Sequence, residues 1–545
     1  MTDGTEAVAD ATTRAVLGID AYLKRVEPTS EWGHRAWRQL ALATVGDEDR
    51  REGLEVLRRL DETVEDEELK RWRRWFNEVP ALTRSLRRLA SGESLRDGDF
   101  FEVKRFLYQG KRLVEAAASV APARSILVGD LAANLRGDQG EQSGAIEGRL
   151  AWLDALLSTI HPGHAESSRF HLADELEAGL GAGRDRRREA KRTLRRHRSA
   201  LEEKVVERWG GRFDLRGRYQ ADDEASGFER DEHLEAVDGI FRAGDEALQT
   251  LREKVEELDA EVTRLEGEAR RRLTEVLARE RAEFEAFRER LGEFDRALTK
   301  VALRRRLQGC WPKDGGEAWL SLEEGRSPEL VDQMGAEAVQ PITAVLERQG
   351  AVVLGPNMGG KSAFLRLLGL SVWCAQMGLC LPAKAAAVGD VDRLVYVGSE
   401  EPRGPDGSEG LSAFGREVQR LVDLWETKAG RTLWLLDEPC RGTHPREGAQ
   451  LAQSIVRQRL ERGDLVVVAT HFPELAQIEG LKTLEVRGLV DDEAALQERL
   501  EKAKRLGKSL KHALREAMDF GLEESDEARV PRDGQRVARA LGLEI

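Results

Sequence analysis

Apolar residues recur at helical spacing through most of the first 300 positions. Between about residues 12 and 90 they alternate with charged residues at intervals of three and four, with tryptophans among them. This pattern predicts a helical N-terminal region over residues 1–95, with the tryptophans packed inward. Similar spacing in Phe101–Leu107 and Leu150–Leu157 predicts a helical core over residues 96–200.

From Leu251 to Leu298 the apolar positions alternate in steps of four and three over several heptads. This is the pattern of a long helix that packs against a partner helix in a coiled coil. A stretch rich in glycine and acidic residues, 210–227, separates it from an earlier helix, so we expect the two helices to pair as an antiparallel hairpin. Coiled-coil lever or clamp arms are therefore predicted over residues 201–305.

After residue 306 the pattern changes to short apolar runs separated by helical segments, which predicts an α/β domain over residues 306–488. Strands are expected at Trp319–Leu322, Ala351–Leu354, Arg393–Val397, Thr432–Leu436 and Leu465–Ala469. A charged helical tail is expected over residues 489–545.

Composition changes this picture in one respect. The chain has 545 residues, 34% of them charged, and a formal net charge of -14. Long-range attraction to nucleic acid is therefore not favoured, and DNA contact needs a local basic surface. The densest basic run, residues 184–198, favours a solvated helix face, and the alternative is contact with phosphates.

The four cysteines have neither metal-binding nor disulfide spacing, which favours a reduced, cytoplasmic protein. The N-terminus lacks the features of a signal peptide, and the longest apolar region, 367–381, is better explained as a buried helix than as a membrane span. No membrane partner is expected.

Three histidines, His161, His164 and His171, surround a Pro-Gly turn. A His-x-x-His pair with a further histidine can bind zinc, but no cysteine or catalytic glutamate completes such a site. The sequence favours a surface loop here.

A glycine loop follows the apolar run at 351–354 and precedes a run with helical spacing. It consists of Gly355, Pro356, Asn357, Met358, Gly359, Gly360, Lys361 and Ser362. In such a P-loop, successive backbone N–H groups surround a polyphosphate, the lysine reaches the β and γ oxygens, and the serine hydroxyl ligates Mg²⁺. The sequence therefore predicts a site for ATP and Mg²⁺.

Two acids, Asp437 and Glu438, end the apolar run at 432–436. The first is expected to lie near Mg²⁺ through a water molecule, and the second to orient or deprotonate the attacking water. His471 ends the run at 465–469 and is expected to sense the γ-phosphate or that water. Ser412 opens a helix, which suits either a simple N-cap or phosphate contact.

Together these residues resemble the MutS family of DNA mismatch-repair ATPases, which belongs to the wider ABC-type group. Further matching residues are Asp392, Arg393, Glu417, Arg441, Thr443, Glu474 and the segment Glu324–Pro328. The resemblance implies an α/β P-loop NTPase domain of the ABC type attached to an all-α core with coiled-coil lever arms. It also implies a homodimer with composite ATP sites, in which Ser412 reaches the γ-phosphate bound by the partner subunit.

The resemblance has departures. The mismatch reader of the family inserts a phenylalanine that lies beside a glutamate, whereas Phe101 and Glu102 lie in a predicted helix, and the chain is too short for the mismatch-binding domain. Pro439, Cys440 and His444 differ from the usual family residues. We therefore expect an ATP-driven dimeric clamp on duplex or branched DNA, in repair or recombination, without the usual mismatch reading. The alternative is a protein-remodelling ATPase with a protein client, such as a cobalamin-dependent aminomutase reactivase.

Overall fold

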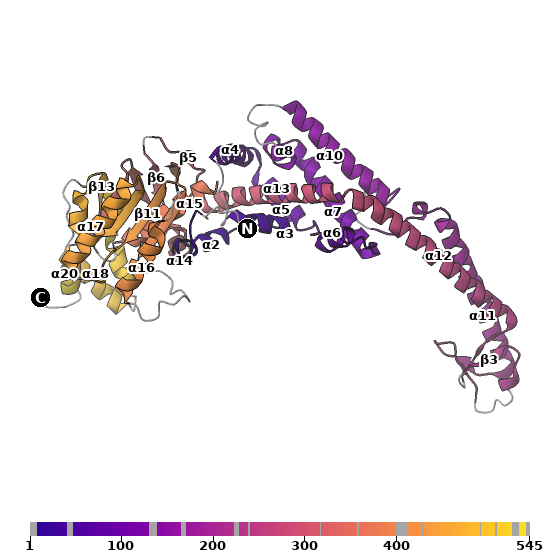
Figure 1. The fold of residues 1–545 in the computed structure, drawn as a ribbon. Coiled ribbons are helices and arrows are strands. Elements are labelled where there is room, and N and C mark those ends of the chain that lie inside the picture. The colour runs from indigo at the N-terminus through magenta and orange to yellow at the C-terminus, as the bar shows by residue number, and fades with distance from the viewer. Residues whose placement is uncertain are drawn as a thin grey trace. The chain divides into compact units, whose positions relative to one another are not determined.

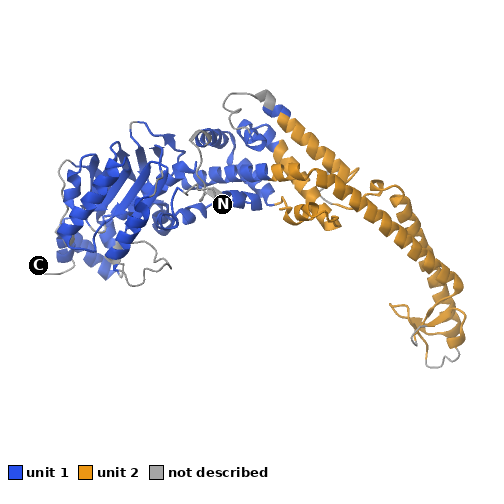
Figure 2. Cartoon of the chain, viewed as in Figure 1, with its two compact units in different colours: residues 1–77, 116–144, 289–545 blue, residues 78–115, 145–288 orange. Residues whose placement is uncertain are grey.

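The computed structural model divides the chain into two compact units, coloured separately in Figure 2. Unit 1 contains residues 1–77, 116–144 and 289–545, and unit 2 contains residues 78–115 and 145–288. The structure describes residues 8–40, 47–129, 139–164, 170–222, 228–237, 240–316, 318–356, 359–398, 412–426, 430–490, 492–506, 510–525 and 533–540. Within these residues no helix has the length and apolar character needed to cross a lipid bilayer.

A six-stranded sheet forms the centre of unit 1, in the order β10-β11-β12-β8-β13-β14 (Figure 1). Its strands are β8 (Gly350–Leu354), β10 (Arg393–Gly398), β11 (Thr432–Asp437), β12 (Leu465–Thr470), β13 (Leu481–Leu489) and β14 (Met518–Glu524). The first five strands in the spatial order run parallel, and β14 is antiparallel to β13. Four strands, β10, β11, β12 and β8, are buried on both faces, which explains their continuous apolar runs.

Helices cover both faces of this sheet. On one face, α15 (Lys361–Gln376) packs against alternate strand residues such as Val353 and Leu435. On the other face, α16 (Ala413–Trp425) and α17 (Pro445–Glu461) pack against the intervening residues, such as Val352 and Leu436. The alternation follows from the twofold side-chain period of a strand.

A second sheet of unit 1 has the order β5-β9-β6-β7. Its strands are β5 (Lys313–Asp314), β6 (Leu320–Gly325), β7 (Ile342–Leu346) and β9 (Ala385–Val388), with α14 (Pro328–Met334) and η3 (Ala336–Ala338) between β6 and β7. The remaining C-terminal elements are η4 (Pro473–Gln477), α18 (Glu493–Arg505), α19 (Leu510–Glu516) and α20 (Asp533–Ala540).

The N-terminal helices belong to the same unit as the sheets. They are α1 (Ala11–Val16), α2 (Ile19–Leu23), α3 (Glu31–Leu40), α4 (Asp47–Thr63) and α5 (Asp66–Phe76), followed later by α8 (Ala121–Val128). The backbone N–H of Leu394 donates to the carbonyl of Val8 at 2.6 Å, and that of Tyr396 donates to Oγ1 of Thr13 at 3.1 Å. The first described residues therefore extend the edge of the main sheet beside β10. The two units do not coincide with the domains that the sequence predicts, and the predicted domain boundaries remain a prediction.

Unit 2 is built mainly from two long helices, α11 (Leu180–Trp209) and α12 (Glu246–Arg279), which pack as a hairpin. Ala190 packs with Val255 and Leu258, and Leu201 packs with Leu248. Between these helices lie β1 (Arg212–Phe213), β2 (Tyr219–Gln220), η2 (Phe228–Arg230), β3 (Leu234–Val237) and β4 (Ile240–Ala243). The paired arms agree with the heptad pattern, but the predicted long helix is divided at Glu280, where α13 (Arg281–Leu307) follows.

Shorter elements complete unit 2. These are α6 (Thr83–Ala90) and η1 (Asp174–Leu176), while α7 (Asp97–Ala118), α10 (Gln139–Ile160) and α13 contribute residues to both units. Phe101 and Glu102 lie within α7, as predicted.

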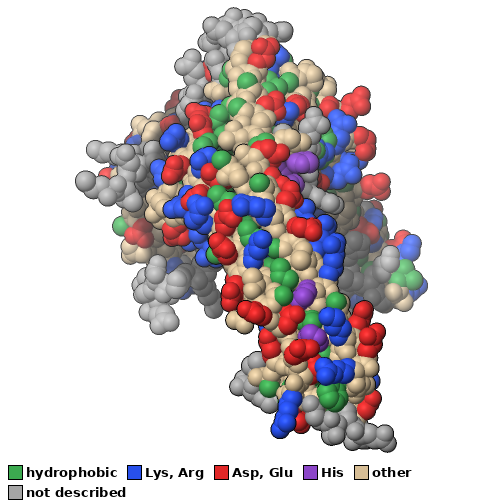
Figure 3. Space-filling model, turned by 90° about the vertical axis from the view of Figure 1, so that its right-hand side faces the viewer, with side chains coloured by type: hydrophobic (Ala, Val, Ile, Leu, Met, Phe, Trp, Pro, Cys, Tyr) green, Lys and Arg blue, Asp and Glu red, His purple; other side chains and the backbone are tan. Residues whose placement is uncertain are grey.

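The basic run 184–198 lies on α11 and is largely paired with acidic residues, several of them on α12. Arg184 binds Glu266 at 2.8 Å, Arg186 binds Glu261 at 2.8 Å, and Lys191 binds Asp259 at 2.8 Å. Figure 3 shows lysine and arginine side chains interspersed with aspartate and glutamate on the face that it presents. These pairs agree with a solvated, charge-balanced helix face and leave little unpaired basic surface for phosphates.

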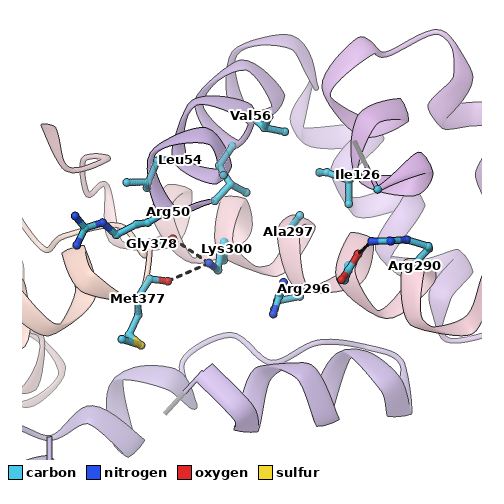
Figure 4. A pocket seen from close by; sticks show the side chains of 14 residues that line it. Arg50, Leu54, Val56, Ile126, Arg290, Arg296, Ala297, Lys300, Met377 and Gly378 are labelled. Carbon is cyan, nitrogen blue, oxygen red and sulfur yellow. Dashed lines mark hydrogen bonds and ion pairs between the residues drawn. The ribbon is translucent and has the colours of Figure 1, made fainter. Parts of the chain in front are cut away.

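A cavity of about 390 Å³ in unit 1 lies at the C-terminal end of α15 (Figure 4). Apolar side chains from α4 and α8 and basic side chains from α13 line it. Lys300 donates to the carbonyls of Met377 at 3.1 Å and Gly378 at 3.0 Å, which are orphan acceptors at the end of the helix. Burial, together with the nearby Arg296, lowers the pKa of Lys300 to about 7.

All five predicted strands are present, with ends within three residues of their expected bounds. The prediction of a helical tail over residues 489–545 is wrong in part, because the strand β14 interrupts the helices. The segment Met518–Glu524 pairs with β13 and completes the main sheet. Within the charged tail, the alternation of Met518, Phe520 and Leu522 with polar or small residues is a short strand signal.

Candidate nucleotide site

The glycine loop connects β8 to α15, the strand–loop–helix arrangement that a P-loop requires. Gly359 N–H donates to the carbonyl of Pro356 at 3.0 Å, which closes the turn. Gly360 has φ 84° and caps α15, a conformation that glycine adopts without strain. Asn357 and Met358 lie outside the described residues.

Lys361 is the first residue of α15, and its side chain is buried inside the loop. Its ammonium donates to the carbonyls of Gly355 at 2.9 Å and Pro356 at 3.0 Å. It also forms an ion pair with Glu438, with Nζ and Oε1 3.1 Å apart. The structure therefore joins the predicted P-loop lysine directly to the predicted general base.

Asp437 ends β11 with its side chain buried. Its Oδ2 accepts a hydrogen bond from the Tyr396 hydroxyl at 2.7 Å. Its Oδ1 is buried and accepts no hydrogen bond from any residue that the structure describes. Gly398 lies opposite Asp437 on the neighbouring strand, where a Cβ would come within 2.9 Å of the aspartate Cβ. Gly398 thus keeps the carboxylate's surroundings open.

Glu438 lies between two cationic or polar partners. Its Oε2 is 2.6 Å from Nδ1 of His471, and its Oε1 faces Lys361. Burial raises the pKa of Glu438, but the hydrogen bond with His471 and the Lys361 ammonium outweigh burial and hold it below the usual range. Glu438 is consequently ionised at neutral pH, as a general base must be.

The backbone after Asp437 is strained. Glu438 has φ 52° and Cys440 has φ 61°, which non-glycine residues rarely adopt. Two hydrogen bonds hold this turn: Glu438 N–H donates to the carbonyl of Ala469 at 2.8 Å, and Cys440 N–H donates to Oε1 of Glu417 at 2.7 Å. Glu417 therefore ties α16 to the turn that positions Glu438, the predicted general base.

Ser412 is the N-cap of α16, where its Oγ accepts a hydrogen bond from Gly415 N–H at 3.0 Å. It is exposed, and no hydrogen bond joins it to the P-loop residues that the structure describes. The capping interpretation is confirmed, and phosphate contact across a dimer remains a prediction.

Two contributors to the site were not predicted. Tyr396 is the single polar side chain in the run at 393–397 that reaches the acids, and its position in a buried strand was the available signal. Phe520 on β14 packs against the loop, since a Cβ on Gly360 would lie 2.9 Å from its ring. Its segment was predicted to be helical, although the alternation of apolar Met518, Phe520 and Leu522 with polar or small residues was an available signal for a strand.

The oxygen donors fit the hard cation that the sequence predicts. Mg²⁺ prefers carboxylate and hydroxyl oxygens, and Asp437 Oδ1 is a buried carboxylate oxygen that accepts no hydrogen bond from the described residues. Ser362 supplies a hydroxyl in the first turn of α15. The chemistry of these two side chains is therefore compatible with Mg²⁺.

A strand, glycine loop and helix with an inward-facing lysine, beside a parallel strand that ends in two acids, define a P-loop nucleotide-binding domain of mixed α/β architecture. Residues 351–541 match the family model for MutS domain V. This part of the chain is therefore similar to MutS domain V.

Proteins of two kinds, DNA mismatch repair proteins MutS and endonucleases MutS2, are similar to this chain. The DNA mismatch repair protein MutS of Chlorobium chlorochromatii is 30% identical over 305 residues, which are 55% of this chain and 34% of that protein. The corresponding protein of Chlorobaculum tepidum is 30% identical over 339 residues, 60% of this chain and 37% of that protein. Endonuclease MutS2 of Geobacillus kaustophilus is 35% identical over 189 residues, 34% of this chain and 23% of that protein. The chain spans less than two fifths of the length of these relatives.

Proposed function

We propose that this protein hydrolyses ATP to ADP and phosphate, with Glu438 as the general base. The carboxylate of Glu438 between Lys361 and His471 is the observation that carries this proposal. An ionised carboxylate at the end of a strand beside a P-loop can accept a proton from the attacking water. His471 holds this carboxylate and is in place to orient the same water.

The glycine loop, from Gly355 to Ser362, would hold the phosphates through backbone N–H groups and Lys361. Ser362 and Asp437 would hold Mg²⁺, which neutralises phosphate charge when bound. The Lys361 ammonium that now pairs with Glu438 would turn to the phosphates, and Glu438 would then be available to the water. We assign the domain to the ABC type on the same grounds.

We also propose that two copies of the chain form composite sites, in which Ser412 of each copy serves the P-loop of the other. The exposed N-terminus of α16, which Ser412 caps, supports this assignment because free N–H groups at a helix start attract phosphate. The nucleotide cycle of this cytoplasmic dimer would control a clamp on duplex or branched DNA in repair or recombination.

The first experiment measures ATP turnover of Glu438→Gln against Glu461→Gln, an exposed glutamate on α17. Loss of a general base should lower kcat by about 10²–10⁴-fold, while ATP binding is retained. The Glu461→Gln variant should match the unchanged protein. Equal turnover in both variants would refute the assignment of the base.

The dimer is tested by mixing two variants that are each inactive alone, Lys361→Met and Ser412→Ala. If Ser412 acts on the partner's nucleotide, a mixed dimer has one site with both residues intact. Equal mixing should then restore about a quarter of the normal turnover, because half of the dimers are mixed and each has one good site. Absence of recovery would place Ser412 outside the partner's site.

DNA contact needs its own test, because most of the basic run on α11 is paired with acidic residues. Arg195 and Arg196 on α11 are exposed and have no ion pair among the described residues, so they are the candidates for phosphate contact. Duplex or branched DNA should raise ATP turnover, with a steep loss of binding as salt rises. Replacing both arginines with glutamine should weaken binding and reduce the salt slope, whereas Arg186→Gln, whose guanidinium binds Glu261, should change it less.

Failure of every DNA to bind or stimulate at low salt would reject the clamp. That result would favour the alternative, a protein-remodelling ATPase such as a cobalamin-dependent aminomutase reactivase. In that case ATP turnover would still be present and would still fall in Glu438→Gln. ATP hydrolysis and the DNA clamp can therefore be refuted separately.

A further inference from the structure

Three histidines of unit 2 converge although they are spread over eleven residues of sequence. His161 follows α10 directly and is 1% exposed, while His164 and His171 are exposed. Nε2 of His161 lies 3.3 Å from Nε2 of His171. One ring nitrogen from each of the three residues can be chosen so that all lie within 4.8 Å of one another. The turn is therefore not the simple surface loop that the sequence favours.

The surrounding elements hold these rings in place. His161 N–H continues the helix by donating to the carbonyl of Leu157 at 3.1 Å, and the turn closes with His164 N–H donating to the carbonyl of His161 at 3.1 Å. The ring of Phe170 packs against that of Phe100 on α7, with centroids 5.6 Å apart, which anchors the residue next to His171. The cluster is thus preorganised by contacts outside the imidazoles themselves.

The distances suit a tetrahedral metal. Two imidazole nitrogens bound to zinc at about 2.0–2.1 Å lie about 3.3–3.4 Å apart when the angle at the metal is tetrahedral. The separation between Nε2 of His161 and His171 is 3.3 Å. The third nitrogen needs only a small movement of an exposed side chain to reach the same distance.

We propose that His161, His164 and His171 form a Zn²⁺ site with a fourth position open to solvent. Neutral imidazoles are preferred ligands of zinc, and three protein ligands with one open position are characteristic of sites that also bind water or an anion. This inference is independent of the nucleotide site and of the proposed function.

A hydrogen bond between two rings would also give the 3.3 Å separation of His161 and His171. That explanation does not require the third ring, His164, to come within reach of both. A zinc site explains all three positions together.

Lys104 on α7 is the group that opposes metal binding. Its amine contacts Nδ1 of His161 and donates to the carbonyl of His164 at 2.9 Å. Coordination through Nε2 of His161 leaves the ring proton on Nδ1, facing a lysine that is itself a donor. A neutral acceptor at this position would suit the coordinated ring better, since metal-bound histidines normally donate their other N–H to an acceptor.

The test titrates nucleotide-free full-length protein with Zn²⁺ alone and follows heat release, with Co²⁺ as a spectroscopic substitute. We expect one metal ion per chain and the strong visible absorption of tetrahedral Co²⁺. The variants His164→Ala and His171→Ala should each weaken binding at least tenfold. His197→Ala is the matched control, because this histidine lies on α11 of the same unit and binds Asp245 instead. It should bind zinc as the unchanged protein does.

Both cluster variants replace exposed side chains, and their thermal unfolding curves should match that of the unchanged protein, which separates lost ligands from lost structure. Lys104→Gln should bind zinc at least tenfold more tightly, because it removes the opposing charge and supplies an acceptor. Substoichiometric binding, or equal affinity in His171→Ala and the unchanged protein, would overturn the proposal. An octahedral Co²⁺ spectrum would also overturn it.

Discussion

Lys361 and Glu438 form an ion pair in the interior of the nucleotide site, with Nζ and Oε1 3.1 Å apart and side chains 5% and 10% exposed. Each residue is thus held by the other in the geometry observed. When phosphate binds Lys361, the ion pair with Glu438 would break. Glu438 would therefore be unable to act before the phosphates are in place.

The pH dependence of turnover should shift when His471 is replaced with alanine. The pKa of Glu438 lies below its usual range, so the base stays ionised on the alkaline side and activity falls as pH drops through that pKa. Removing the His471 hydrogen bond removes one cause of the lowering, so the pKa should rise. The acid limb of the kcat/KM profile should move to higher pH, and an unmoved limb would show that His471 does not set this pKa.

Tyr396→Phe should destabilise the protein and weaken its use of Mg²⁺. The variant leaves Oδ2 of the buried Asp437 without its hydrogen-bond donor, which costs about 1–3 kcal/mol. Urea unfolding measures the loss, and turnover against Mg²⁺ concentration should show a higher half-saturation point. Tyr108→Phe, on α7, is the control for loss of a tyrosine hydroxyl. Unchanged stability in Tyr396→Phe would mean that another donor replaces the hydroxyl.

Gly360→Ala should impair both folding and nucleotide binding. Alanine at φ 84° is strained by more than about 1 kcal/mol, and its Cβ would also lie 2.9 Å from the Phe520 ring. Adding Phe520→Ala should relieve the steric part and leave the backbone strain. Urea unfolding of the two single variants and the double variant measures this coupling. If the changes in unfolding free energy of the single variants simply add in the double variant, the Phe520 ring moves aside without cost.

Lys300→Met should flatten the dependence of stability on pH. Folding lowers the pKa of Lys300 from 10.5 to about 7. Between those values the unfolded chain binds more protons, so the free energy of unfolding rises with pH, while below about pH 7 the cost of burying the charge is fully present.

The measurement is urea unfolding at several pH values from neutral to alkaline. Lys300→Met should show a smaller slope than the unchanged protein, whereas Lys204→Met, which replaces an exposed lysine of α11, should keep the slope. Equal slopes in all three proteins would contradict a lowered pKa at Lys300.

The catalytic strands could be predicted because burial on both faces forces continuous apolar runs, and the acids at 437 and 438 mark where one run ends. The P-loop could be predicted because its chemistry fixes residue types at close spacing. The ion pair between Lys361 and Glu438 could not, since it depends on the order of strands in the sheet. The positive φ of Glu438 and Cys440 has no sequence signal either, because neither residue type favours that conformation.

The same limit applies to longer-range contacts. The charged segment 518–524 becomes a strand only because β13 offers an unpaired edge. For the basic run on α11 the sequence favours a solvated face over phosphate contact, but the acidic partners on α12 that balance its charge become visible only in the fold.

The position of Phe520 has a practical consequence for dividing this protein. Because β14 supplies a side chain that packs against the P-loop, a fragment ending at residue 488 would lose the sixth strand and one wall of the nucleotide loop. The smallest piece able to bind nucleotide normally must therefore extend past residue 524. A partner that binds β14 could therefore change the position of the loop without contacting the predicted catalytic residues.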